Sequence, residues 1–171
     1  MPPSNQTAPG YVQPTAPPWS VLALLPRPFW PWLKNYYAYA SSILPLAAAG
    51  VSVASTQIQT DAWFVLLSAT MTMRDTATNT VLFPSRNATV QIFDSSAGMN
   101  LFSQAVDADE FFGDAAQPGY LAYPYIFKPG GNIQTTVTNL DGTNARNLRF
   151  TYHGFKANPN VLEDDYPGVN Y

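Results

Sequence analysis

Apolar and polar residues alternate strictly along Leu148–His153, near the C-terminal end of the chain. The preceding run, Asn132–Asn139, carries β-branched residues at alternate positions. A period of two residues is typical of strands that bury one face. Asp141 and Gly142, between the two runs, favour a tight reversal. We therefore expect a long hairpin. The residues expected to face its core are Val137, Leu148, Phe150 and Tyr152.

Shorter runs of the same kind precede this hairpin. The segments expected to form strands are Val51–Gln59, Trp63–Met73, Val81–Phe83, Thr89–Phe93 and Met99–Phe102. Val106–Phe112 is expected to form one helical turn, which Gly113 would end. Several short strands at this spacing predict an all-β fold, an antiparallel β-sandwich or jelly roll.

The first 50 residues differ from the rest of the chain. Ten of the 16 prolines lie before residue 46, and the first acidic residue is Asp61. Such a segment is expected to be extended. The sequence therefore predicts an N-terminal arm over residues 1–50, a β-sandwich domain over 51–156 and a C-terminal tail over 157–171.

Aromatic residues crowd into the segment Trp19–Tyr39, which Pro26, Pro28 and Pro31 keep from being helical. Several exposed rings in water would be costly, so we expect this aromatic arm to lie against another surface. A neighbouring protein is the preferred surface; a lipid interface and the chain's own core are alternatives. The expected protein-interface residues are Trp19, Phe29, Trp30, Trp32, Tyr36 and Tyr37.

Residues 36–54 are close to the length of a membrane span, but they are weakly apolar and contain Ser41, Ser42 and Pro45. A loop that leads into a strand at Val51 is the preferred reading. We therefore expect no membrane partner.

Charged residues make up only 11% of the chain, which favours extensive contact with other protein, including copies of itself in a homo-oligomer. The formal net charge of −3 argues against a nucleic-acid partner. The chain has no cysteine, which excludes disulfides, thiolate metal sites and a cysteine nucleophile.

Few residues are candidates for catalysis. His153 is the only histidine, and no nucleophile motif accompanies it, so a structural role is expected. Asp107, Asp109 and Glu110 form a carboxylate cluster that could hold Ca²⁺, but their spacing fits no EF-hand loop. A solvated acidic loop is the preferred interpretation. We expect no enzyme activity, no cofactor and no metal.

Five stretches together resemble small structural proteins of tailed bacteriophage virions, of the capsid-decorating or neck-associated kind. These stretches are Val90–Gly98, Phe112-Gly113 with Pro118 and Leu121, Pro124–Gly130, Ile133–Asn139 and Leu148–Lys156. The resemblance covers about residues 60–156. It implies a β-sandwich or jelly-roll virion component that is present in many copies.

The expected function is therefore a capsid cement or decoration subunit that binds the phage head shell through its arm. Its expected partners are the major capsid protein or other virion proteins, and its expected location is the virion, assembled in the host cytoplasm. A neck or collar protein at the head–tail junction is one alternative. A carbohydrate-binding β-sandwich, directed at a receptor, is another.

Overall fold

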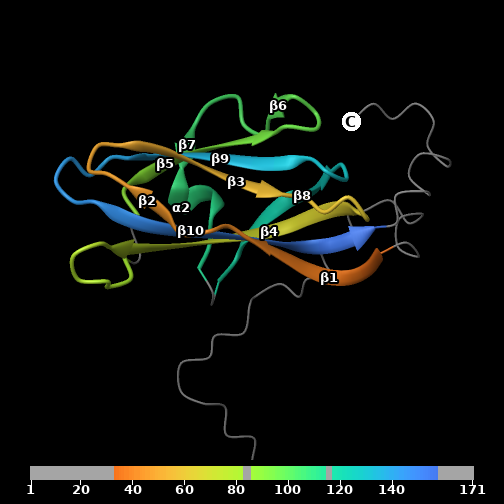
Figure 1. Cartoon of the computed structure of the whole chain (residues 1–171), viewed down its shortest axis with the longest axis horizontal. Coiled ribbons are helices and arrows are strands. Elements are labelled where there is room, and N and C mark those ends of the chain that lie inside the picture. The colour runs from red at the N-terminus through yellow and green to blue at the C-terminus, as the bar shows by residue number, and fades with distance from the viewer. Residues whose placement is uncertain (1–32, 83–85, 115–116, 158–171) are drawn as a thin grey trace, which may run out of the picture.

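The computed structural model describes residues 33–82, 86–114 and 117–157, which form two antiparallel sheets stacked face to face (Figure 1). The elements are β1 (Leu33–Ala40), β2 (Leu44–Leu46), β3 (Val51–Gln57), β4 (Trp63–Asp75), β5 (Ala88–Asp94), β6 (Met99–Asn100), β7 (Val106–Asp107), α2 (Ala108–Phe111), β8 (Gly119–Phe127), β9 (Asn132–Asn139) and β10 (Arg146–Ala157). The predicted all-β class is confirmed, and the expected helical turn is α2.

Each of the two sheets has five strands, and strands that follow one another in the chain often lie in different sheets. The first, sheet A, has the order β1-β10-β4-β8, with β2 also paired to β10. The second, sheet B, has the order β3-β9-β5-β6, with β7 also paired to β5. All of these strand pairs are antiparallel.

The pairing is nested around the connection between β5 and β6. Strand β5 pairs with β6 and β7, β4 with β8, β3 with β9, and β1 and β2 with β10. The chain is thus one long antiparallel hairpin that rolls up until β10 also pairs with β4, and β9 with β5. This is the jelly-roll arrangement of a double-sheet sandwich, and it confirms the fold class expected from the sequence.

The prediction that residues 132–139 and 148–153 form a hairpin is wrong. Strand β9 lies in sheet B and β10 lies in sheet A, so the residues between them cross from one sheet to the other. The turn also differs: Gly142 is not among the glycines with positive φ, which are Gly98 and Gly130. The Asp141 carboxylate holds the connection instead, because it accepts hydrogen bonds from the backbone N–H groups of Thr143 and Asn144.

The expected inward-facing residues are confirmed. Val137, Leu148, Phe150 and Tyr152 are each at most 1% exposed and belong to one apolar core. Alternation decides which face of a strand is buried, whichever strand lies beside it. The core assignment was therefore correct although the strand partner was not.

Hydrogen bonds also join the two sheets through the core. The buried hydroxyl of Tyr152 in β10 bonds to that of Thr135 in β9. The hydroxyl of Tyr125 in β8 donates to the buried carboxylate of Asp94 in β5 over 3.0 Å. Each bond satisfies polar groups that would be costly to leave unpaired in an apolar interior.

The sheets begin closer to the N-terminus than residue 51. Strands β1 and β2, at residues 33–40 and 44–46, pair along β10 and form one edge of sheet A. The loop expected over this stretch is therefore replaced by strands, and the arm expected over residues 1–50 overlaps the sandwich. No helix within the described ranges is long and apolar enough to cross a membrane.

The Phe150 ring provides a test of the core. It is 0% exposed and packs 5.1 Å from the Phe112 ring, centroid to centroid. Phe150→Ala should lower the free energy of unfolding by about 3–5 kcal/mol, because it removes a large ring and leaves a cavity. Leu140→Ala is the matched control, since Leu140 is 53% exposed. Equal denaturant midpoints for the two variants would contradict this core.

Candidate functional site

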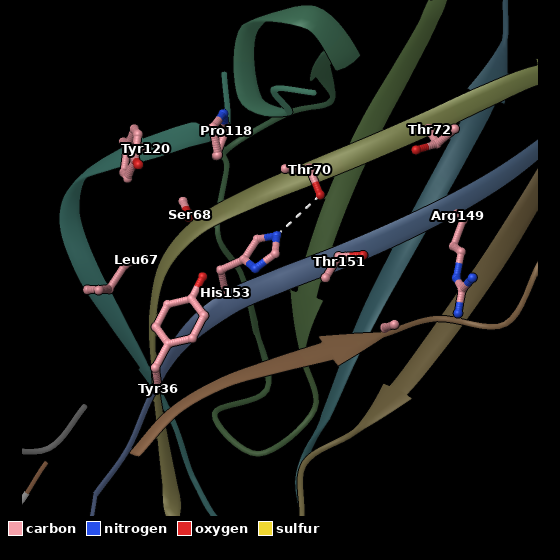
Figure 2. Close-up of a pocket in the computed structure, with 11 residues that line it drawn as sticks. Tyr36, Leu67, Ser68, Thr70, Thr72, Pro118, Tyr120, Arg149, Thr151 and His153 are labelled. Carbon is pink, nitrogen blue, oxygen red and sulfur yellow. Dashed lines mark hydrogen bonds between the residues drawn. The ribbon is translucent and has the colours of Figure 1, made fainter. Parts of the chain in front are cut away.

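The outer face of sheet A carries a groove of about 620 Å³ (Figure 2). Its walls come from β1, β4, β10 and the start of β8. The residues that line it are Tyr36, Ala40, Leu67, Ser68, Thr70, Thr72, Pro118, Tyr120, Arg149, Thr151 and His153. Its volume lies in the range of small-molecule sites.

Strand register builds the floor of this groove. In β10, Arg149, Thr151 and His153 face outward because Leu148, Phe150 and Tyr152 face the core. They pair with Thr72, Thr70 and Ser68 of β4, respectively. Two adjacent strands therefore present a regular block of polar side chains. Just beyond it the register shifts in a bulge between His153 and Gly154. Residue 154 must be glycine there, because a Cβ would lie 1.9 Å from the Val65 carbonyl oxygen.

Tyr36 forms the aromatic wall of the groove. Its ring stacks on His153, with centroids 6.2 Å apart and planes 18° from parallel, and meets the Phe155 ring edge-on at 5.7 Å. The residue is still 57% exposed. One ring face thus has support from the protein while much of the ring remains open to solvent.

His153 contacts a second residue of the groove besides Tyr36. Its Nε2 lies 3.3 Å from the Thr70 hydroxyl, as the dashed line in Figure 2 shows. Partial burial lowers the pKa of His153 below the ordinary histidine value. Burial also raises the pKa of Tyr36, and the nearby Tyr120 adds to the effect. Both side chains are therefore neutral at pH 7.

The outer face of sheet B is different in character. Its outward-facing positions carry no charged side chain on β3, β9 and the centre of β5. These residues are Val51, Val53, Ser55, Gln57, Thr89, Gln91, Phe93, Asn132, Gln134, Thr136 and Thr138. We call this surface the neutral face. A broad sheet face without charge is the composition expected of a protein contact.

The edge of sheet B beside the neutral face is unprotected. Among the residues that the structure describes, strand β3 pairs only with β9, in unbroken register from Val51 to Gln57. It has neither proline nor charge, and Val51 and Val53 are 61% and 54% exposed. Natural edges of this kind usually carry a charge, a proline or a bulge that blocks pairing with another chain. The β3 edge is thus open to a partner.

The acidic residues at α2 do not converge on one point. Asp109 forms an ion pair with Arg86 at 2.7 Å, and its other carboxylate oxygen accepts a bond from the Arg86 backbone N–H. The Arg86 guanidinium also donates to the carbonyls of Phe112 and Gly113, and it is buried. Asp107 and Glu110 are exposed. Within the described part of the chain, no group of three candidate ligands could hold a metal ion.

The interface residues expected from the sequence fall into two groups. Tyr36 and Tyr37 lie in β1, where Tyr36 faces outward and Tyr37 packs toward the core beside Tyr39, at 4.7 Å. The Lys156 ammonium lies 4.5 Å above the Tyr37 ring, so this ring already has partners within the chain. Trp19, Phe29, Trp30 and Trp32 lie outside the described residues.

Sequence reasoning missed the groove and the neutral face. The signal for the groove was the set of polar residues at alternate positions 149, 151 and 153. The groove was missed because residues 148–153 were expected to pair with residues 132–139, whereas they pair with Trp63–Asp75, whose hydroxyl side chains complete the floor. The neutral face required knowledge of which three strands lie side by side, which periodicity does not provide.

The sequence matches no family model and no curated protein. Among solved structures, the infectious bursal disease virus VP2 subviral particle is similar, with a TM-score of 0.24 and 8% identity over 77% of this chain. The structure of the infectious bursal disease virus Gt strain gives a TM-score of 0.21, with 8% identity over 80% of this chain. The chain spans 44% and 46% of the length of those two chains. Likenesses at these TM-scores carry no argument about function.

The Arg86–Asp109 pair provides a test of whether the acidic segment stabilises the fold through an ion pair. Asp109→Ala should destabilise the fold by about 1–3 kcal/mol, because it removes the carboxylate from buried Arg86, while solvent screens the 38% exposed Asp109 side chain. Glu110→Ala, one residue away and exposed, should change stability by less than about 0.5 kcal/mol. Urea unfolding of both variants measures the difference. A midpoint that rises when Ca²⁺ is added to the native protein would contradict the ion-pair role.

Proposed function

We propose that this chain is a non-enzymatic structural subunit of a virion, a cement or decoration protein that binds the capsid shell. The observation that carries the proposal is the pairing of a neutral sheet face with an unprotected edge strand on one side of a jelly roll. Jelly rolls of this topology are common in viral capsid and lectin domains. The resemblance to phage virion proteins points the same way.

The neutral face suits a partner that is itself a folded protein. Val53 and Thr136 are neighbours on this face, and neither carries a charge that would lose its hydration on contact. The β3 edge adds free backbone donors and acceptors beside them, which an extended segment of the partner can pair. The partner in this proposal is the major capsid protein, with further copies of this chain beside it, and the location is the assembled particle.

A lysine on the neutral face tests the proposal. Thr136→Lys should leave the melting temperature within about 2 °C of the native value, because the side chain faces outward. It should reduce incorporation into particles by at least about tenfold, since a buried lysine without a partner is costly at an interface. Incorporation is measured by quantitative mass spectrometry of purified particles from cells that carry the variant.

Thr72→Lys is the matched control, because it places the same charge on the outer face of sheet A, where Thr72 is exposed. Normal incorporation of the Thr136→Lys protein would contradict the assigned face. The same spectra give the copy number per particle. Hundreds of copies indicate the head shell, whereas about a dozen would indicate a neck or collar ring. Absence of the native chain from purified particles would overturn the virion role itself.

A further inference from the structure

The groove on sheet A has a composition that assembly does not explain. It combines two exposed aromatic rings, Tyr36 and Tyr120, with a floor of hydroxyl groups, and it lies on the face opposite the neutral face. Aromatic rings bind apolar surfaces, whereas hydroxyls both donate and accept hydrogen bonds. A ligand that matches the groove must therefore present C–H surface and many hydroxyls together.

Several polar groups in the floor are available to such a ligand. Among the described residues, no side-chain hydrogen bond is made by Ser68, Thr72 or Thr151. Ser68 is only 5% exposed, yet it lines the groove. The Ser68 hydroxyl is not among the buried polar atoms that lack a partner, so it is open to the groove and can donate to or accept from water or a ligand. The floor is thus prepared to hydrogen-bond a polar molecule.

The charges of the lining residues restrict the class of ligand further. The described residues of the lining include no carboxylate, and burial favours the neutral forms of Tyr36 and His153. Arg149 is the single formal charge, placed at one end of the groove in Figure 2. Its guanidinium has no ion-pair partner within the described ranges. Arginine matches the geometry of a carboxylate, which it can bind through two parallel hydrogen bonds.

We propose that this groove binds a saccharide chain that contains an acidic sugar unit. One sugar ring packs its C–H face on Tyr36, which His153 and Phe155 hold in place from behind. The hydroxyls of Ser68, Thr70 and Thr151 bond to sugar hydroxyls along the floor. Arg149 binds the carboxylate of a uronic acid unit. The site leaves the neutral face free, so a subunit held on a particle by sheet B presents the groove outward.

The test uses the full chain and an array of neutral and uronate-containing oligosaccharides, followed by titration of the strongest binder. Uronate-containing members should bind with a Kd below about 1 mM. Tyr36→Ala should weaken binding at least tenfold, and Thr151→Val, which keeps the side-chain shape, should weaken it several-fold. Arg149→Gln should reduce binding of the acidic member to the level of its neutral counterpart.

Tyr123→Ala is the control, because Tyr123 is 77% exposed and does not line the groove. It should bind as the native chain does. If every variant melts at the same temperature as the native chain, any loss of binding is due to the substituted side chain and not to unfolding. The proposal is overturned if no array member binds, if Tyr36→Ala and Thr151→Val bind normally, or if Tyr123→Ala loses binding equally. Preference for neutral oligosaccharides would overturn the role of Arg149.

Discussion

The pairing of β10 with β4 is the interaction on which the rest of this structure depends. Their register runs from Arg146 opposite Asp75 to Ala157 opposite Trp63, with one shift at Gly154. This pairing brings β10, at the open end of the rolled hairpin, beside β4, which lies near its closed end, so it fixes which residues form the inside of sheet A. The same register sets Arg149, Thr151 and His153 beside the hydroxyls of β4. The pairing of β10 with β4 therefore positions both the core residues on the inner face of sheet A and the groove residues on its outer face.

A large part of the fold follows from local pattern. Alternation in residues 148–153 identified Phe150 and Tyr152 as core residues, because a strand has only two faces. Short strands and few charges predicted a sandwich. The partner of each strand did not follow from the pattern, because period two is the same for a hairpin and for a connection between sheets. The Asp141-Gly142 pair favoured a reversal within one sheet, and the structure uses it to cross between sheets.

The N-terminal boundary was harder to predict for a different reason. Prolines and aromatic residues suggested an extended arm as far as residue 50, yet the extended conformation is also that of a strand. Tyr39 alternates with Ala38 and Ala40, but alanine is only a weak signal for a strand. The partner of this segment, β10, lies more than 100 residues later in the chain. Only that distant pairing distinguishes an arm from a strand here.

The two outer faces of the sandwich differ in a way that accounts for the proposed roles. Sheet B offers a neutral surface and an open edge, which suit contact with another protein. Sheet A offers hydroxyls, one supported tyrosine and one arginine, which suit a polar ligand in solution. The few charged residues are therefore not spread evenly over the two faces. On one face, strands β3, β9 and β5 carry no outward charge, with Asp107 of β7 at its margin, and the other face carries a few placed groups.

Hydroxyl-radical footprinting of intact particles, compared with the free chain, tests the account most directly. Oxidation at Val53 and Phe93, both on the neutral face, should fall several-fold in the particle. Oxidation at Tyr36 on sheet A should stay the same, because that face remains open. Unchanged oxidation of Val53 and Phe93, together with protection of Tyr36, would show that the subunit binds through the opposite face and would contradict the account.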